Sequence, residues 1–289
     1  METAGKPWTA SLRTKVLVPV IAVFAAMLAV TVWFVNHRLN LQIEADARAA
    51  LTTDDTVFRT LQANHLNYLR VRFQSLANEP KNRAALGTLD FNTIQKQLES
   101  ILQDENALQQ SATLNEHIAF ILFTPENDAA EKTEPMIQPE TASDALVSAS
   151  KLNVQRVMHP DDDASPTLSD TVAVGDKLYN LVSVRVYTPE HLLLGVLTVG
   201  EEAGLFTARE YFEVTGKPIV FVADGKPVLS TFPSHLESET VGAWFLRTTS
   251  GGTKKADRVV RVEVNDGHYF CASGQFSSVK KDASNGYLL

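Results

Sequence analysis

The hydrophobic pattern begins with an unbroken apolar stretch near the start of the chain. Residues 16–35 read VLVPVIAVFAAMLAVTVWFV and contain no charged side chain. At about 1.5 Å per residue, a helix of this length matches a hydrocarbon core of roughly 30 Å. Lys6, Arg13 and Lys15 precede the stretch, and this excess of basic residues predicts a cytoplasmic N-terminus. We therefore expect residues 1–15 in the cytoplasm, a transmembrane helix over 16–35, and everything after residue 36 outside.

A cleaved signal peptide is the competing interpretation, because it also starts basic and continues apolar. The apolar run is longer than the usual signal-peptide core of about 7 to 15 residues. It also ends in the bulky residues VWFV, where a cleavage site needs small side chains. These two features favour an uncleaved anchor that contacts the lipid bilayer through residues 16–35.

The next segment predicts a long helix, because no glycine or proline occurs between His37 and Asn78. Pro80 marks its expected end. In its second half, apolar or ambivalent side chains recur every three to five residues, at Phe58, Leu61, His65, Tyr68, Phe73 and Leu76. This stripe has two interpretations: a seam between two copies of the chain, or a cover for the protein's own sheet. A second helix is expected over 92–110.

Beyond residue 116 the pattern changes to short β-rich runs. HIAFILFTP at 117–125 predicts a strand. Residues 124–166 contain five prolines and no glycine, which predicts a long surface insertion with some helix around 141–157. Strands resume over 172–199, with turns expected at Gly175-Asp176 and at 188–191.

The strand expected from Leu178 to Tyr187 has two unlike faces, because side chains alternate along a strand. Its even-numbered positions are mostly apolar: Asn180, Val182, Val184 and Val186. Its odd-numbered positions mix aromatic, hydroxyl and guanidinium groups, as a small-molecule pocket does: Tyr179, Leu181, Ser183, Arg185 and Tyr187. The alternative is a half-solvated face from which Arg185 extends into water. The candidate ligand-binding residues are Tyr179, Ser183, Arg185 and Tyr187.

The C-terminal third predicts a helix and two hairpins. EEAGLFTAREYFEVTG reads as a helix with acids in its first turns and Gly216 as its C-cap. In GKPIVFVADGKPVLSTF, Asp224-Gly225 separates two β-rich runs and is a strong hairpin signal. A second hairpin is expected to turn at residues 265–267. The strands thus divide into a first set over 117–200 and a second over 218–289.

Composition removes several classes of function. The net charge is −8 and no dense basic cluster occurs outside the N-terminus, so a nucleic-acid partner is not expected. The single cysteine, Cys271, excludes an internal disulfide and a cysteine-based zinc site. Cys271 lies in the apolar run HYFCASG, where we expect a small core residue.

The sequence contains no complete set of catalytic motifs. SSVK at 277–280 matches Ser-x-x-Lys, but the companion motifs of that enzyme class are missing. HPDDD at 159–163 has ligands for a hard cation, although a solvated acidic loop is the commoner origin of such a run. The sequence also lacks a Walker loop and a Gly-x-Ser-x-Gly elbow. We expect no catalytic residue, no bound metal and no cofactor.

Three stretches resemble the double Cache sensor domains of bacterial transmembrane receptors: VGDKLYNLVSVRVY, LLGVLTVGEE and YFEVTGKPIVFVADGKPVLSTF. The resemblance covers residues 36–289 and rests on fold-forming patterns. It implies an α+β fold in which an N-terminal transmembrane helix continues into a long helix, followed by two PAS-like (Cache) antiparallel-sheet modules. The expected parts are the helices over 36–110, a membrane-distal module over 111–203 with an insertion at 124–166, and a membrane-proximal module over 204–289.

The resemblance also implies a function. Such domains are extracytoplasmic ligand-sensing regions of sensor kinases and nucleotide cyclases in the bacterial inner membrane. We expect a small-molecule ligand, a homodimer, and a ligand-induced shift of the long helix relative to the C-terminal strand. Receptors of this kind have a second membrane helix and a cytoplasmic output domain, which these residues lack, so we expect a fragment of a longer receptor. The amino-acid-binding signature of one Cache subgroup cannot be placed here.

Two other functions compete with the sensor. One is a membrane-anchored periplasmic binding or scaffold protein with no output domain. The other is a secreted hydrolase, which requires carboxylates or a Ser–His pair converging in a pocket.

Overall fold

The computed structural model describes residues 12–88, 90–111, 118–123, 135–138, 142–158, 167–188, 190–232, 240, 242–245, 259–264, 267–276 and 285–289. The chain divides into two compact units, Met1–Ala50 and Leu51–Leu289. In the first unit the described residues belong to helix α1 (Leu12–Asn78). This helix contains an 18-residue window with a mean hydropathy of 2.5, of which nothing is buried, so by length and composition it is able to cross a bilayer.

The second unit contains the final part of α1, the helices α2 to α5 and the strands, and residues 242–245 are also helical. After α1 come α2 (Pro80–Gly87) and α3 (Phe91–Ser111), and Pro80 opens α2 at a position where the missing N–H costs nothing. Along the chain follow β1 (Ile118–Phe123), β2 (Pro135–Ile137), α4 (Asp144–Met158), β3 (Thr167–Val174), β4 (Lys177–Tyr187), β5 (Leu193–Ala203) and α5 (Leu205–Thr215). The last elements are β6 (Val220–Ala223), β7 (Lys226–Ser230), β8 (Val260–Val264), β9 (Gly267–Cys271), β10 (Ser273–Gln275) and β11 (Gly286–Leu288).

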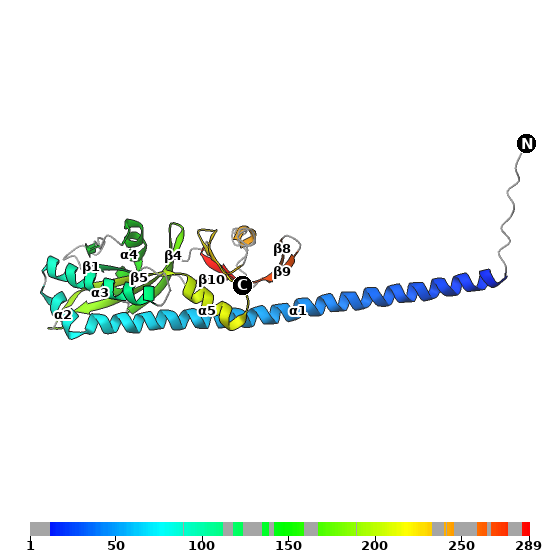
Figure 1. Cartoon of the computed structure of the whole chain (residues 1–289), viewed down its shortest axis with the longest axis horizontal. Helices are drawn as coiled ribbons and strands as arrows, with labels where there is room; N and C mark the ends of the chain where they lie inside the picture. Colours follow the sequence, from blue (N-terminus) through cyan, green and yellow to red (C-terminus); the bar gives the residue numbers. More distant parts are fainter. Residues whose placement is uncertain are drawn as a thin grey trace, which may run out of the picture. The chain divides into compact units, whose positions relative to one another are not determined.

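The first sheet has the strand order β2-β1-β5-β4-β3 and is antiparallel throughout. Helices cover both of its faces (Figure 1). One face packs against α1, α2 and α3 through Val182, Val184 and Val186. The other face packs against α4 through Leu181 and Val196. The expected alternation along β4 is confirmed, and both faces are closed by helices.

The second sheet has the order β10-β11-β6-β7, and β8 and β9 form a separate two-stranded pair within the described residues. The hairpin of β6 and β7 turns at Asp224 and Gly225, whose φ angles are 46° and 75°. A two-residue turn of this hand requires positive φ at both positions, which explains why Asp-Gly occurs there. Residues 265–266 of the other predicted turn lie outside the described residues.

The stripe on α1 covers the protein's own sheets. Leu69, Phe73 and Ala77 pack against the first sheet, and Leu51 and Phe58 pack against the core of the second. The predicted stripe was wrong at one position, Tyr68.

Tyr68 is 56% exposed and its neighbour Leu69 is buried instead. Leu69 and Phe73 are four residues apart, which keeps them on one helical face, whereas the step of five from Tyr68 to Phe73 does not.

The helix expected from Glu201 begins later than predicted, whereas its C-cap and the burial of Cys271 are as expected. Glu201 and Glu202 lie in strand β5, which ends at Ala203, and do not open the following helix, which begins at Leu205. The C-cap is confirmed, since Gly216 has a left-handed φ of 68° and donates its N–H to the carbonyl of Phe212. Cys271 is buried, as expected of a core thiol.

Candidate ligand-binding face

The candidate residues lie on the face of the first sheet that packs against α4. Tyr179 is half-buried against the apolar cluster on this face, and Ser183 is fully buried. Arg185 reaches α4, where its Nε donates to the carbonyl oxygen of Val157 at 2.7 Å. Tyr187 is half-buried and follows a register shift between β4 and β5. The sheet therefore orients Tyr179, Ser183 and Arg185 toward one helix.

Distances along β4 show which of the candidate residues a single small molecule could contact. Tyr179 and Arg185 are six positions apart, which is about 20 Å along an extended strand, whereas Ser183 and Arg185 are about 7 Å apart. A small molecule that contacts Arg185 therefore reaches Ser183 and not Tyr179. Burial raises the pKa of Tyr179, and the negative charge of Glu202 adds to the rise, so this phenol stays neutral near pH 7.

Two buried donors on this face have no hydrogen-bond partner in the described part of the chain: Nη2 of Arg185 and Nδ2 of Asn153. Asn153 is only 1% exposed and lies on α4, one turn before Val157. Nε of Arg185 donates to the carbonyl of Val157, so Arg185 lies at the contact between β4 and the end of α4, one helical turn after Asn153. A buried donor without a partner costs about 1 to 3 kcal/mol, and native proteins keep few of them.

Asn153 was not among the residues predicted from the sequence. The helical spacing along α4 could have indicated it, because Asn153 shares the buried face of the helix with Leu146, Ser150, Val154 and Val157. An amide at a position where the helix is otherwise apolar is unusual. The hydroxyls nearby are already satisfied, because Ser183 and Thr198 bond each other at 2.9 Å and Ser150 donates to the carbonyl of Val147.

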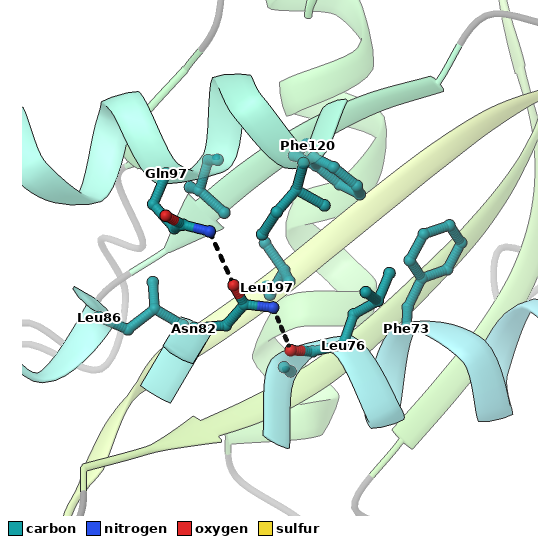
Figure 2. Close-up of a pocket in the computed structure, with 10 residues that line it drawn as sticks. Phe73, Leu76, Asn82, Leu86, Gln97, Phe120 and Leu197 are labelled. Carbon is teal, nitrogen blue, oxygen red and sulfur yellow. Dashed lines mark hydrogen bonds between the residues drawn. The ribbon is translucent and has the colours of Figure 1, made fainter. Parts of the chain in front are cut away.

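The opposite face of the first sheet contains a small cavity beneath α1, α2 and α3. Figure 2 shows Asn82 and Gln97 at its wall, among apolar side chains that include Phe73 and Phe120. Asn82 donates to the carbonyl of Leu76 at 2.7 Å and accepts from Gln97 at 2.8 Å. The cavity volume is about 10 Å³, close to that of one water molecule. It is a packing defect near the end of α1, too small for a ligand, and none of the candidate residues lines it.

A buried polar layer joins α1 to the first sheet. Gln62 donates to Thr171 at 3.2 Å, and Thr171 donates to Asn180 at 3.0 Å. His65 Nε2 lies 2.6 Å from Glu201 Oε2, and these side chains are 12% and 3% exposed. Directional contacts of this kind define how α1 is placed along the sheet, because a shift of the helix would leave buried polar atoms without partners.

Acidic residues of α1 anchor the second sheet. Asp55 accepts from the hydroxyl of Tyr287 on β11 and from Arg59, and Asp54 accepts from Lys217. Burial raises the pKa of Tyr287, and its hydrogen bond to Asp55 raises it further, so its hydroxyl remains a donor. The C-terminal strand is therefore tied to α1 by a hydrogen bond to a charged group.

The sequence offered an acidic run, a Ser-x-x-Lys match and one cysteine as possible sources of chemistry. Among the described residues, no three His, Cys, Asp or Glu side chains gather as a metal site. The acidic run at 159–163 and the Ser-x-x-Lys match at 277–280 lie outside the described residues. Burial raises the pKa of Cys271 to about 11, so its thiol is a poor nucleophile at neutral pH.

No protein-family model matches the chain, and no curated protein matches its sequence. Among solved structures, it is similar to the periplasmic domain of LuxQ from Vibrio cholerae, with 13% identity and a TM-score of 0.48 over 82% of this chain and 97% of that one.

It is also similar to the sensory domain of the Campylobacter jejuni chemoreceptor Tlp3, solved with isoleucine, with 14% identity and a TM-score of 0.38 over 84% and 90%. The ligand-binding domain of the Pseudomonas aeruginosa chemoreceptor PctC, solved with GABA, is 16% identical, with a TM-score of 0.38 over 81% of this chain and 95% of that one.

These likenesses are to sensor domains, and the five-stranded and four-stranded antiparallel sheets are those that the double Cache resemblance implies. Because all three TM-scores lie below 0.5 and all three identities below 25%, we infer no ligand, partner or activity from them.

Proposed function

We propose that the chain is the ligand-sensing region of a bacterial transmembrane receptor and binds a small molecule between β4 and α4. The observation that carries this proposal is the pair of buried donors without described partners, on Arg185 and Asn153. A ligand with acceptor oxygens, such as a carboxylate, would bond both groups and remove the cost of leaving them unpaired. Ser183 and Tyr187 are the neighbouring candidates, and the chain itself performs no catalysis.

A membrane location is part of the proposal. The apolar part of α1 is a helix without buried surface, with side chains such as Phe24, Met27 and Trp33 each more than 60% exposed. A large exposed apolar surface is unfavourable in water and normal in lipid. We propose that residues 16–35 span the inner membrane, with residues 1–15 in the cytoplasm and the sheets outside, in a membrane-distal module over 111–203 and a membrane-proximal module over 204–289.

Helix α1 offers a route for a signal. Its inner face packs on the cores of both sheets, and Asp55 holds β11 through Tyr287. Ligand binding at α4 would change the position of α1 relative to β11, and an output domain after the C-terminal strand would respond. A ligand shifts such an equilibrium only by its different affinities for the two states.

A thermal-shift screen of small acids, amino acids and amines against the full chain in nanodiscs tests this function. A ligand at 100 times its Kd stabilises the protein by about 2.7 kcal/mol. Arg185→Ala and Asn153→Ala should each abolish the shift. The matched control is Arg209→Ala, at an exposed position of α5, which should keep it. A ligand whose shift survives both Arg185→Ala and Asn153→Ala would overturn the site.

A further inference from the structure

The buried polar layer between α1 and the first sheet contains a pair of side chains that can exchange a proton with the medium. Nε2 of His65 on α1 lies 2.6 Å from Oε2 of Glu201 on β5, and the two side chains are 12% and 3% exposed. The other polar residues described in this layer, Gln62, Thr171 and Asn180, do not titrate. An ordinary imidazole changes its charge between about pH 5 and pH 8, so the charge of this contact depends on the pH of the medium.

The position of His65 gives this contact leverage over α1. Phe58, two turns earlier, packs into the core of the second sheet, and Leu69, one turn later, packs into the core of the first. His65 therefore lies where the inner face of the helix passes from one core to the other. Apolar packing holds α1 on either side of this point, whereas directional polar contacts hold it here.

Other charged and titratable groups lie on the elements packed around this contact. In the described part of the chain they are Tyr68, Arg70 and Arg72 on α1, Glu105 on α3, Asp170 on β3, Lys177 and Tyr179 on β4, and Glu202 on β5. Arg72 and Glu105 bond each other through two hydrogen bonds of 2.8 Å. Side-chain alternation places the strand residues of this list on the opposite face of the sheet, where Lys177 bonds Glu202 at 2.8 Å. None of these groups therefore replaces Glu201 as the partner of His65.

The sign of the pH dependence follows from the burial of Glu201. With His65 protonated, the carboxylate meets a positive charge at 2.6 Å, whereas with His65 neutral it is a buried negative charge beside a neutral ring, which is unfavourable. When α1 is undocked, water solvates both side chains, and an imidazole in water has a pKa of about 6.5. The docked state thus holds the proton more tightly. Its extra stability is fully present below about pH 6.5 and is lost as pH rises until the docked state also releases the proton.

We infer that the contact between His65 and Glu201 makes the packing of α1 on the first sheet depend on pH. In acid the ion pair fixes the helix, and above about pH 7 the helix moves more freely relative to β5. This regulation needs no ligand, because neither residue lies on the face that packs against α4. It rests on the proposed function in one respect: with the sheets outside the cytoplasm, the pH that acts on α1 is that of the cell's surroundings. Acidity is then a second input to the chain, beside a small molecule.

Hydrogen exchange with mass spectrometry of the ligand-free full chain in nanodiscs, between about pH 5.5 and pH 8, tests this inference. After correction for the intrinsic pH dependence of exchange, peptides covering residues 61–70 of α1 should lose protection about fivefold or more as pH rises. Strand β6 of the second sheet should keep its protection. Unchanged protection over 61–70, or an equal loss in β6, would overturn the inference.

Substitutions separate the proton from the hydrogen bond. His65→Gln keeps a side-chain amide that can donate to Glu201 but has no titratable ring, so the loss of protection with pH should vanish. A double variant, His65→Gln with Glu201→Gln, leaves no charge in the contact and should also be insensitive to pH. The matched control is His37→Gln, at an exposed histidine of the same helix, which should respond to pH as the parent does. A pH response that persists in both His65 variants would contradict the assignment.

The pH experiment contains no ligand, so its outcome is independent of what the small-molecule screen finds. At pH 5.5 any ligand-induced thermal shift should be the same in His65→Gln and in the parent protein, because the substituted side chain lies on the other face of the sheet. A failure of the pH response and a failure of the ligand site therefore give different results.

Discussion

Replacing Phe58 with alanine should detach α1 from the second sheet while leaving the first sheet packed. Phe58 is 0% exposed and its ring contacts four others: Tyr287 with centroids 4.2 Å apart, Phe221 at 5.7 Å, Tyr211 at 5.9 Å and Phe276 at 6.3 Å. Removing a buried phenylalanine costs about 3 to 5 kcal/mol through lost transfer energy and the cavity left behind. Rings on every side cannot collapse into that space together, so we expect the upper half of this range.

Chemical denaturation of the full chain in detergent, followed by circular dichroism, measures the loss. Hydrogen exchange with mass spectrometry locates it: β6 and β11 should exchange faster, and β4 and β5 should not. Phe91→Ala is the matched control, because the same side chain is 47% exposed there and should cost at most about 1 kcal/mol. A loss below 1 kcal/mol for Phe58→Ala, or equal acceleration in β4, would refute this account of the core.

Three further predictions concern single sites. Asn153→Leu should raise the stability of the ligand-free protein by about 1 to 3 kcal/mol in urea melts, because it removes an unpaired buried donor. The same variant should abolish the ligand-induced thermal shift. Destabilisation by Asn153→Leu would show that the amide is paired. Gly274→Ala should destabilise the second sheet, since an added Cβ would lie 2.2 Å from the ring of Tyr287, and a melting temperature within 1 °C of the parent would contradict this contact.

The thiol of Cys271 should resist Ellman's reagent at pH 8 until the protein unfolds, because burial raises its pKa to about 11. An exposed thiol, as in the unfolded chain, has a pKa of about 8.5. Because the folded protein holds the thiol proton more tightly, the stability gained from the neutral buried thiol is fully present below about pH 8.5 and is lost as pH rises towards 11. Between pH 8 and pH 10.5 the urea midpoint should fall less in Cys271→Ala than in the parent protein, because the variant has no thiol to ionise. An equal fall in both proteins would be evidence against a raised pKa of Cys271.

Much of the fold was predictable because its signals are local. The apolar run, the long helix that ends before Pro80, and the Asp224-Gly225 turn each depend on residues close together in the chain. The alternation along β4 similarly predicted that Ser183 and Arg185 share a face, which the structure confirms. The error at Tyr68 came from extending the stripe by a step that no helix face accommodates.

The tertiary structure decided which faces meet. Arg185 bonds the carbonyl of Val157 because α4 packs across β4, and nothing in the local pattern of either element predicts that crossing. Tyr287 and Asp55 are 232 positions apart, and His65 and Glu201 are 136 apart. Local periodicity determines which side of an element is apolar, but the partner of that side depends on the register and packing of distant elements. The sequence therefore predicted the elements and which residues of β4 share a face, and the packed chain supplied the helix that covers this face.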